Sequence, residues 1–475
     1  MRNSRRSLIA AIIVLSLVLG GLLAFAMTLQ SNPEEPTIPT QPTDSTPTQP
    51  TETDPTTEPT TEPSTEPTTE PTTEPTTAPT EPPVVKVSTA TIGATGDILP
   101  HDKVIRSGYN SATDTFDYSY IFEFFGAYAQ RVDYAVANLE TTLIQKPGSA
   151  GLKGYNGYPN FNAPDEIVDA LKDAGFDMLL TANNHSYDTR HDGFARTPQA
   201  IADKGLASIG TYRTMEEKRY TIVEVNGIRI GMINYTYNTG IKEDGSVSLN
   251  SIPLSVADSK LINNFNYWAL DAFYAELQGH LNAMKAEGAE ATVLYIHWGD
   301  EYKTTPNATQ KKMAQDLCNL GIDVIVGNHA HVAQPVELLT NENDGSKTLC
   351  LYSTGNSVSN ISRSDSRPMY TEDGMLFYFT FAKYSDGTVV VESADVLPTW
   401  VWRHDVAGVR KFTVLTLDRE IEDWKTHLNI TDAVLAECKA SYKRTMDILG
   451  EGLEAANAWF ASNQAQVEAQ LGVTK

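Results

Sequence analysis

The chain has 475 residues, a net charge of −24 and three cysteines. Such an acidic protein is poorly suited to general nucleic-acid binding, so we expect no nucleic-acid partner. The odd cysteine count gives no disulfide framework, and the sequence has no CxxC metal site; Cys318, Cys350 and Cys438 are interpreted as small buried hydrophobes.

Residues 1–30 have the pattern of a membrane anchor. Three arginines (Arg2, Arg5 and Arg6) precede Leu8–Met27, twenty residues in which only one serine is polar. A helix of that length spans a bilayer, and the basic flank holds the N-terminus in the cytoplasm. We favour an uncleaved single-pass anchor with an extracellular C-terminal domain. The alternative is a cleaved signal peptide and hence a secreted protein, because Ala24-Phe25-Ala26 has the small-x-small pattern of a cleavage site.

Residues 31–83 form a low-complexity linker built on repeats of Thr-Thr-Glu-Pro. Its apolar residues are too few to bury a core, so we expect a disordered or extended spacer. In a polyproline II conformation its reach is on the order of 150 Å.

Residues 84–418 alternate strands and helices at first, and hairpins dominate later, which predicts an α/β domain with a mixed sheet system. In chain order we expect strands at Ala90–Thr95 and Tyr134–Ala137, a helix at Asp165–Ala174, strand Phe176–Leu180, helix Thr197–Lys204, strand Ala207–Ile209, hairpin Arg219–Val225 with Ile228–Asn234, helix Trp268–Glu287, strand Ala291–Ile296, helix Ala308–Leu320, strand Ile322–Val326, hairpin Met375–Ala382 with Thr388–Ser393, and strands Val396–Trp402 and Lys411–Leu417.

Residues 419–475 form a helical extension without a functional motif. Two apolar stripes predict two helices packed on the core. One stripe is Ile421, Trp424 and Leu428, and the other is Leu449, Leu453, Ala456 and Phe460.

Five expected strands lead directly into residue types that bind metals. The stretches are Gly96-Asp97, Asn138-Leu139-Glu140, Asn183-Asn184-His185, His297-Trp298-Gly299 and His329-Ala330-His331. In an open α/β sheet the carboxyl ends of the strands meet along one crevice. Carboxylates, an amide and several imidazoles gathered there predict a divalent-metal site.

Residues around these stretches suggest supporting roles. Asp188 lies three residues after His185 and can orient and charge its imidazole, which suits acid–base chemistry. Gln334 follows the His-x-His stretch and is a candidate for binding substrate or supporting a ligand. Each motif taken alone is also compatible with an ordinary loop or a solvated strand end.

Taken in order, the five motifs resemble the CapA family of capsule-synthesis proteins, associated with poly-γ-glutamate, a branch of the calcineurin-like metallophosphoesterases. The stretches Gly93–Pro100, Asn160–Pro164, Glu301-Tyr302 and Tyr352–Asn356 also match, and the resemblance covers about Ala90–Tyr384. It implies a four-layer α/β sandwich of metallophosphoesterase type over residues 84–418.

The resemblance also implies one or two divalent metal ions, of Mn, Zn or Fe. Asp97 and His331 would hold the first ion, Glu140 would bridge, and Asn184, His297 and His329 would hold the second. His185, oriented by Asp188, would be the general acid, with Asn183, Glu301 and Gln334 in substrate or supporting positions. One position departs from the pattern: typical metallophosphoesterases have Asp-x-His in the first motif, and here the third residue is Leu99.

Three functions remain open at this point. The chain is expected to be a membrane-anchored protein of poly-γ-glutamate synthesis, export or attachment, with the polymer and other capsule-synthesis proteins as partners. Alternatively, it is a surface metal-dependent hydrolase of phosphoesters or amides. The third alternative is a non-enzymatic scaffold that binds a cell-surface polymer.

Overall fold

The computed structural model describes residues 84–361, 370–418, 423, 425–426 and 429–470. The apolar segment Leu8–Met27, the linker 31–83 and the stripe of Ile421, Trp424 and Leu428 lie outside these residues, so their assignments stay predictions. Within the described part of the chain, no helix combines the length and apolar character needed to cross a bilayer.

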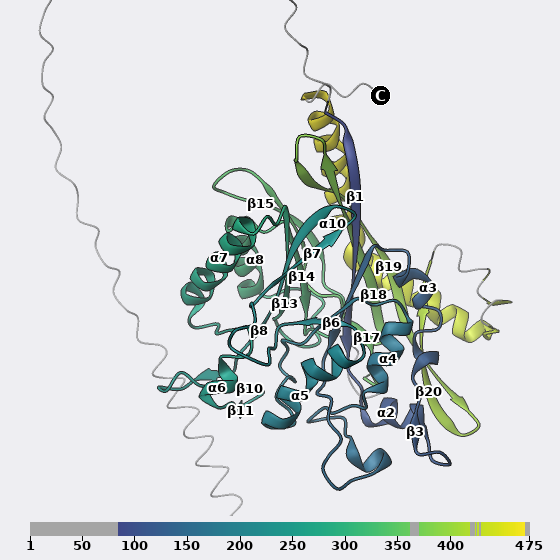
Figure 1. Ribbon diagram of the computed structural model, residues 1–475. Helices are drawn as coiled ribbons and strands as arrows, with labels where there is room; N and C mark the ends of the chain where they lie inside the picture. The colour runs from purple at the N-terminus through teal and green to yellow at the C-terminus, as the bar shows by residue number, and fades with distance from the viewer. Residues whose placement is uncertain (1–83, 362–369, 419–422, 424, 427–428, 471–475) are drawn as a thin grey trace, which may run out of the picture. The chain divides into compact units, whose positions relative to one another are not determined.

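Two large mixed sheets form the framework (Figure 1). The first sheet has eight strands, in the order β20 (Val409–Thr416), β19 (Val389–Val406), β18 (Asp373–Tyr384), β1 (Lys86–Ile98), β4 (Tyr134–Leu139), β5 (Met178–Leu180) and β6 (Ala207–Ile209), with β17 (Asn356–Val358) beside the end of β1. The second sheet has seven, in the order β12 (Asn264–Phe265), β8 (Ile228–Tyr237), β13 (Ala291–His297), β14 (Val324–Asn328), β16 (Lys347–Leu351) and β15 (Val336–Thr340), with β7 (Thr221–Val225) beside β8.

Alternating side chains place the two sheets face to face. On β1 and β4, Ile92 and Val136 point into a core that also contains Met232 and Val293 of the second sheet. Residues of opposite parity, such as Leu139 on β4 and Leu294 on β13, belong to two separate outer cores. A strand places successive side chains on opposite faces, so each sheet is buried on both sides.

Helices cover the outer faces and complete four layers, as the fold prediction expected. On the first sheet, α4 (Glu166–Asp173) and α5 (Arg190–Asp203) contribute apolar residues to the outer core. On the second sheet, α7 (Leu270–Ala286) and α8 (Ala308–Asn319) do the same. The shorter elements are α2 (Asp102–Gly108), β2 (Tyr109–Asn110), β3 (Thr115–Phe116), η1 (Ser119–Ile121), α3 (Gly126–Ala129), η2 (Gly151–Gly154), β9 (Gly240–Ile241), β10 (Val247–Leu249), β11 (Ile252–Pro253) and α6 (Val256–Ser259).

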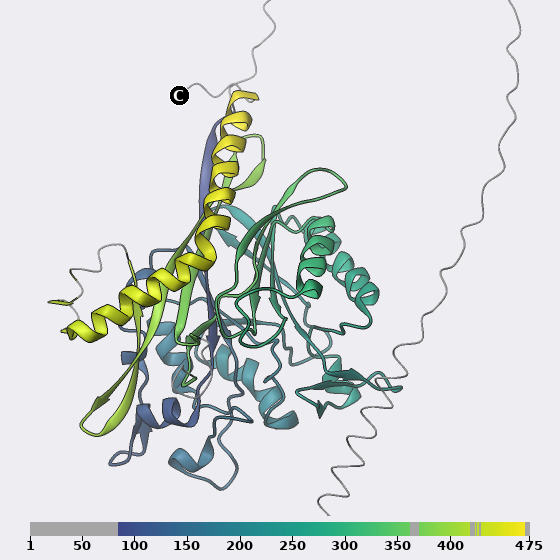
Figure 2. The ribbon, with the colours of Figure 1, turned by 180° about the vertical axis from the view of Figure 1, so that it is seen from behind.

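The C-terminal extension contains the second of its two predicted helices, α10 (Asp432–Gln470), which faces the viewer in Figure 2. The described residues 423, 425 and 426, within the first predicted helix, are helical as well, and the rest of that helix stays a prediction. Its stripe of Leu449, Leu453, Ala456 and Phe460 lies in the core between the sheets. Gly452 packs so closely on β15 that a Cβ there would lie 1.9 Å from the carbonyl oxygen of Val336. The extension is therefore part of the core of the fold.

The late hairpin differs from its prediction. Thr388–Ser393 and Val396–Trp402 were expected as separate strands, but β19 is continuous through them. Ala394 and Asp395 pair with Phe379 and Tyr378 of β18, and a register shift between Thr380 and Phe381 accommodates one extra residue. Ala394 and Asp395 therefore continue the strand, and the extra residue of the β-bulge is Glu392, between Val391 and Ser393.

Candidate metal centre

The ends of parallel strands bring the predicted residues together. β1, β4 and β5 run parallel in the first sheet, and β8, β13 and β14 run parallel in the second. A hydrogen bond joins these strands across the sheets, because the main-chain N–H of Ala182 donates to the side-chain Oδ1 of Asn234 at 2.8 Å. The two sets of strand ends therefore face a shared site.

A bulge at Gly96 turns Asp97 into this site. Residues 90, 92 and 94 of β1 point into the central core, so an unbroken strand would turn Asp97 outward. The register shifts between Thr95 and Asp97, and Asp97 pairs with Asn138 on the inward face of β4. Only glycine fits at the bulge, because a Cβ on Gly96 would lie 1.8 Å from the carbonyl oxygen of Gly355.

One group of donors consists of Asp97, Glu140 and His331. Their ligand atoms lie within 4.8 Å of one another, and all three residues are buried. His331 Nδ1 is 2.9 Å from Asp97 Oδ2 and 3.9 Å from Glu140 Oε2. Asn138 Nδ2 donates to the other oxygen of Asp97 at 2.7 Å and fixes the carboxylate.

A second group consists of Glu140, His297 and His329, with Asn184 beside them. His297 Nε2 is 2.8 Å from Asn184 Oδ1, 3.1 Å from His329 Nδ1 and 3.5 Å from Glu140 Oε1. Donor atoms bound at roughly 2.1 Å to one tetrahedral ion lie about 3.4 Å apart, so this spacing fits a single ion.

Glu140 belongs to both groups, and neither oxygen of its carboxylate accepts a hydrogen bond among the described residues, although three imidazoles lie 3.5–3.9 Å away. The residue is completely buried. Burial, with a further contribution from the charge of Asp97, raises the pKa of Glu140 well above its ordinary value. A buried carboxylate without hydrogen bonds is costly, and a divalent cation on each oxygen would remove that cost. The residues present therefore fit a bridged pair of metal ions.

The imidazoles have the protonation state that ligands need. Burial lowers the pKa of His297 to about 3 and takes the pKa of His329 well below its usual range, so both rings keep a free lone pair. Burial alone would lower the pKa of His331, but its hydrogen bond to Asp97 and the charge of Asp97 outweigh burial and raise it. Metal binding at His331 would displace a proton.

His185 lies beside the two groups without belonging to either. Its Nδ1 is 2.7 Å from Asp188 Oδ2, and its Nε2 is 3.9 Å from Glu140 Oε1. Asp188 also accepts the N–H of Phe161 at 2.5 Å. Burial raises the pKa of Asp188, partly offset by the hydrogen bond from His185. Because Asp188 holds Nδ1, the Nε2 atom is the one directed at the centre.

The three residues predicted in supporting positions have different surroundings. Asn183 Nδ2 donates to the carbonyl oxygen of Leu139 at 2.9 Å and ties the β5 loop to β4. Glu301 is exposed and lines a cavity beside the centre. Gln334 is fully buried, accepts from Gln310 at 3.0 Å and donates to the carbonyl of Lys303 at 2.7 Å. Its side chain thus supports the loop after β13.

A cavity of about 410 Å³ opens beside the centre. His185 and His331 line it together with Glu301. The other lining residues are Leu99, His101, Tyr158, Phe161, Tyr302, Asn360 and Ile361. It is the space from which a substrate would reach the donor atoms.

Three neighbours of the centre were not predicted. Tyr237 OH is 3.3 Å from His329 Nε2, and Asn250 Oδ1 accepts from Asn184 Nδ2 at 3.1 Å. Asn356 Oδ1 is 3.0 Å from His331 Nδ1. Tyr237 and Asn250 carry no local motif. Asn356 lies in the matching stretch Tyr352–Asn356, which was the available signal.

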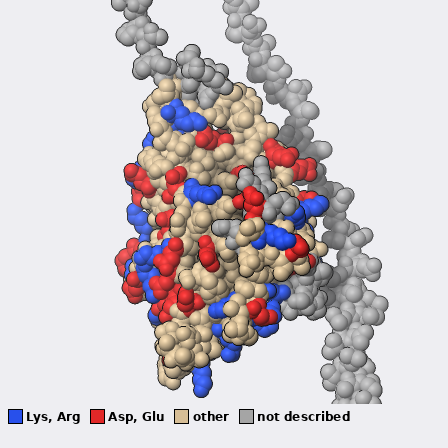
Figure 3. Space-filling view, turned by 90° about the vertical axis from the view of Figure 1, so that its right-hand side faces the viewer, with Lys and Arg blue, Asp and Glu red and all other residues tan. Residues whose placement is uncertain are grey.

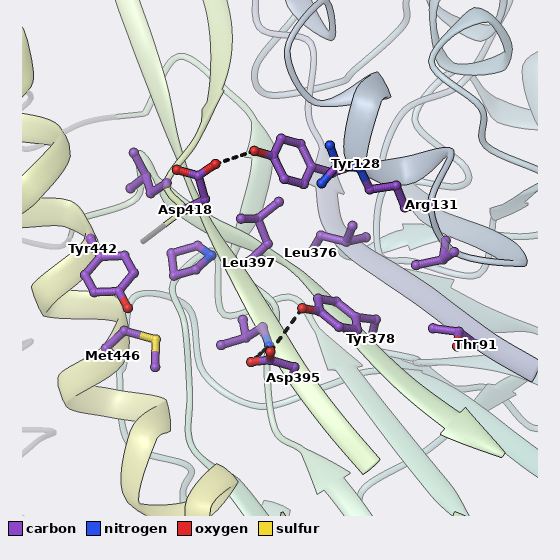
Figure 4. Close-up of a pocket in the computed structure, with 14 residues that line it drawn as sticks. Thr91, Tyr128, Arg131, Leu376, Tyr378, Asp395, Leu397, Asp418, Tyr442 and Met446 are labelled. Carbon is purple, nitrogen blue, oxygen red and sulfur yellow. Dashed lines mark hydrogen bonds between the residues drawn. The ribbon is translucent and has the colours of Figure 1, made fainter. Parts of the chain in front are cut away.

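Another cavity, of about 290 Å³, lies between α10 and the first sheet and shares no lining residue with the one at the centre (Figure 4). Tyr128 OH donates to Asp418 Oδ2 at 2.5 Å, and Tyr378 OH donates to Asp395 Oδ2 at 3.1 Å. Leu376 and Leu397 give it an apolar wall.

Comparisons with known proteins agree with these observations. The chain is 27% identical over 277 residues to the capsule biosynthesis protein CapA of Bacillus anthracis, which covers 56% of this chain and 59% of that protein. It is 26% identical over 278 residues to the PGA biosynthesis protein CapA of Bacillus subtilis, covering 58% and 65%. The match thus spans about three fifths of each of these relatives.

Among solved structures, a sulfate thiohydrolase SoxB of Thermus thermophilus is similar at 14% identity and a TM-score of 0.32, over 66% of this chain and 42% of that one. The overlap is too small to bear on function. The family model for the bacterial capsule synthesis protein PGA_cap matches residues 91–361, which include every donor of the candidate centre. The chain therefore belongs to the PGA_cap family of bacterial capsule synthesis proteins.

Proposed function

We propose that the chain takes part in the synthesis, export or attachment of poly-γ-glutamate at the cell surface, through a dinuclear metal centre at the ends of β1, β4, β13 and β14. Family membership and the names of the two Bacillus relatives support the polymer. The observation that carries the metal centre is the carboxylate of Glu140. It belongs to both groups of donors, and its two buried oxygens lack hydrogen-bond partners among the described residues.

Asp97, Glu140 and His331 would hold the first ion, and Glu140, Asn184, His297 and His329 the second. Bound divalent ions polarise a carbonyl or phosphoryl group and lower the pKa of a coordinated water. Acidic polymers carry carboxylates, and the protein face in Figure 3 mixes basic with acidic side chains and has no broad basic area. Bound cations would attract the carboxylates of such a polymer, so we propose that the polymer contacts the metal centre and its cavity.

A second function, hydrolysis of a phosphoester or an amide, is favoured by the His185–Asp188 pair at the edge of the cavity. Asp188 keeps the proton of Nδ1 in place and supports a positive charge on the ring. The Nε2 proton is then available to a leaving group next to the centre, which is the role of a general acid.

We also propose that the N-terminal segment Leu8–Met27 anchors the protein in the cell membrane and that residues 84–475 lie outside the cell. The three arginines before the segment support this orientation. The linker would then hold the domain within reach of the polymer at the cell surface.

The test measures polymer binding and turnover by the full chain loaded with Mn²⁺. Poly-γ-glutamate is followed by size-exclusion chromatography, and a panel of model phosphoesters and γ-glutamyl amides is followed by product release. Metal-dependent co-elution of the polymer with the protein, absent in His329→Ala, supports the proposal. Metal-dependent hydrolysis of phosphoesters or amides, shortening of the polymer included, supports the second function. Polymer binding without turnover by both the parent and His329→Ala points to a scaffold and contradicts metal-dependent action.

A further inference from the structure

The carboxamide of Asn356 faces the first group of donors. Asn356 begins β17, which pairs in parallel with the end of β1, and its register partner is Asp97. The residue is fully buried, and its Oδ1 lies 3.0 Å from His331 Nδ1. The same nitrogen is 2.9 Å from Asp97 Oδ2, so amide and carboxylate oxygens converge on one point.

Hydrogen bonds fix which end of the amide faces the centre. Asn356 Nδ2 donates to the carbonyl oxygen of Thr371 at 2.9 Å and to that of His331 at 3.2 Å. Both amide hydrogens are used by these two acceptors. A flipped amide would set its oxygen against two carbonyl oxygens, so Oδ1 is held toward His331 Nδ1.

Backbone packing fixes the position of Asn356 as well. Gly355 has φ 71°, and its carbonyl oxygen occupies the space in which a side chain of Gly96 would lie. On the other side, a Cβ on Gly374 would lie 2.0 Å from the carbonyl oxygen of Asn356. Glycines on the two flanking strands thus allow a close approach that holds the β17 backbone in place.

Asn138 offers a comparison on the opposite side of Asp97. It is the register partner of Asp97 on β4, but its amide has the reverse orientation. Asn138 Nδ2 donates to Asp97 Oδ1 at 2.7 Å, and Asn138 Oδ1 accepts from Asn183 Nδ2 at 3.3 Å. Asn138 can therefore orient a ligand but offers no lone pair to an ion beside Asp97, whereas Asn356 does.

We propose that Asn356 Oδ1 is a ligand of the first metal ion, together with Asp97, Glu140 and His331. This inference rests on the proposed metal centre. Leu99, two residues after Asp97, is buried and supplies no donor atom, and the amide oxygen completes a set of four. The first site then has three oxygen ligands and one nitrogen ligand, while the second site has two oxygen ligands and two nitrogen ligands.

The donor sets give the two sites different preferences. Oxygen-rich sets favour Mn²⁺ and Mg²⁺, while imidazole suits Zn²⁺ and Fe²⁺. The first site is therefore expected to take Mn²⁺ in preference to Zn²⁺, and the second site, with His297 and His329, to take Zn²⁺. A mixed centre is the expected result when both ions are supplied.

The test compares Asn356→Ala with Asn356→Asp in the full chain, measuring Mn²⁺ stoichiometry and affinity by titration and metal analysis. Asn356→Asp loses both Nδ2 hydrogen bonds but keeps an oxygen for the ion. A ligand role predicts two ions in the parent and in Asn356→Asp, and at least a tenfold loss of affinity at one site in Asn356→Ala. Asn360→Ala, which removes an amide that lines the neighbouring cavity and is no proposed ligand, is expected to keep both ions.

Equal loss of Mn²⁺ in the alanine and aspartate variants would assign Asn356 a purely structural role and overturn the inference. Full binding by Asn356→Ala, or the same loss in Asn360→Ala, would overturn it too. If Asn356→Ala does not fold, Asn356→Asp decides alone, because two ions support the ligand role and one ion contradicts it. A parent that binds no ion would refute the metal centre itself, a separate result.

Discussion

At the scale of single residues, the candidate centre consists of donor atoms at strand ends and of side chains that contact them. The donors lie at or just after the ends of apolar strands, which converge in parallel sheets, so their positions were predictable from the sequence; they are Asp97, Glu140, Asn184, His297, His329 and His331. Tyr237 and Asn250 reach the centre through tertiary packing that leaves no local pattern, whereas Asn356 lies in the family-matching stretch Tyr352–Asn356. Gln334 bonds to Gln310 and Lys303, and its predicted role toward substrate or a ligand stays a prediction.

The first residue-scale prediction separates proton transfer from metal binding. His185→Asn should keep the metal content and lower turnover about 10²–10⁴-fold, because it removes the acid but no ligand. The turnover of Asp188→Asn should lie between that of His185→Asn and that of the parent, because the substitution removes the charge that orients the imidazole ring. Asn184→Ala should instead lose metal. The assay is turnover on the substrate panel with metal analysis on the same samples. Unchanged turnover in His185→Asn on every substrate would show that His185 is not the acid.

A second residue-scale prediction concerns pH. Burial lowers the pKa of His101 to about 4 from its ordinary 6.5. Between these pH values the unfolded chain binds a proton at His101 and the folded chain does not, so stability falls as the pH drops. This lowering of the pKa of His101 corresponds to a loss of folding free energy on the order of 3 kcal/mol between pH 6.5 and pH 4.

His101→Gln should remove this loss. Urea unfolding at pH 7 and pH 4.5 gives the free energy of unfolding of parent and variant at each pH. The parent should lose more stability than His101→Gln between the two values. Equal losses in both proteins would mean that His101 is not kept neutral by the fold.

At the scale of elements, a helix or strand was predicted correctly where its sequence pattern is local, and less well where its shape depends on distant contacts. The capping box of α8 joins Asn307 and Gln310, which are three residues apart, and that helix lies where its sequence predicts. The bulges at Gly96 and in β19 depend on contacts with strands far away in the sequence, so the sequence alone did not reveal them. The position of α10 in the central core also depends on distant contacts, because the helix packs on β15 and β19.

The element-scale prediction tests whether α10 belongs to the core. Leu453 is buried between the sheets, and Leu453→Ala should lower the free energy of unfolding by about 3 kcal/mol through lost burial and a cavity. Glu454→Ala, at the next and exposed position, should change it by less than about 0.5 kcal/mol. Denaturant titration measures both. Equal effects of the two substitutions would mean that α10 does not pack as described.

At the scale of the whole molecule, the organisation combines a described domain with segments known only from their sequence. Residues 84–418 form the two-sheet fold, and the helix at 432–470 completes its core. We propose that the N-terminal segment and the linker set the location of the domain, and the arginines at positions 2, 5 and 6 are the reason to expect it outside the cell.

The topology prediction is tested with protease on intact cells. Cleavage within the linker should release a soluble fragment that begins near Val84, because the linker is expected to be extended and accessible. A cytoplasmic protein detected in the same sample should stay intact as the control. A domain that is protected until the cells are lysed would contradict the extracellular location.

The most direct test of the metal centre uses Glu140→Gln, which keeps the shape of the side chain and removes its charge. Without metal, the variant should be at least as stable as the parent, because a buried carboxylate without partners is costly. On addition of Mn²⁺, the melting temperature of the parent should rise and two ions should bind, whereas the variant should respond weakly or not at all. A parent that binds no metal, with a melting temperature unchanged by Mn²⁺ and by Zn²⁺, would contradict the metal centre.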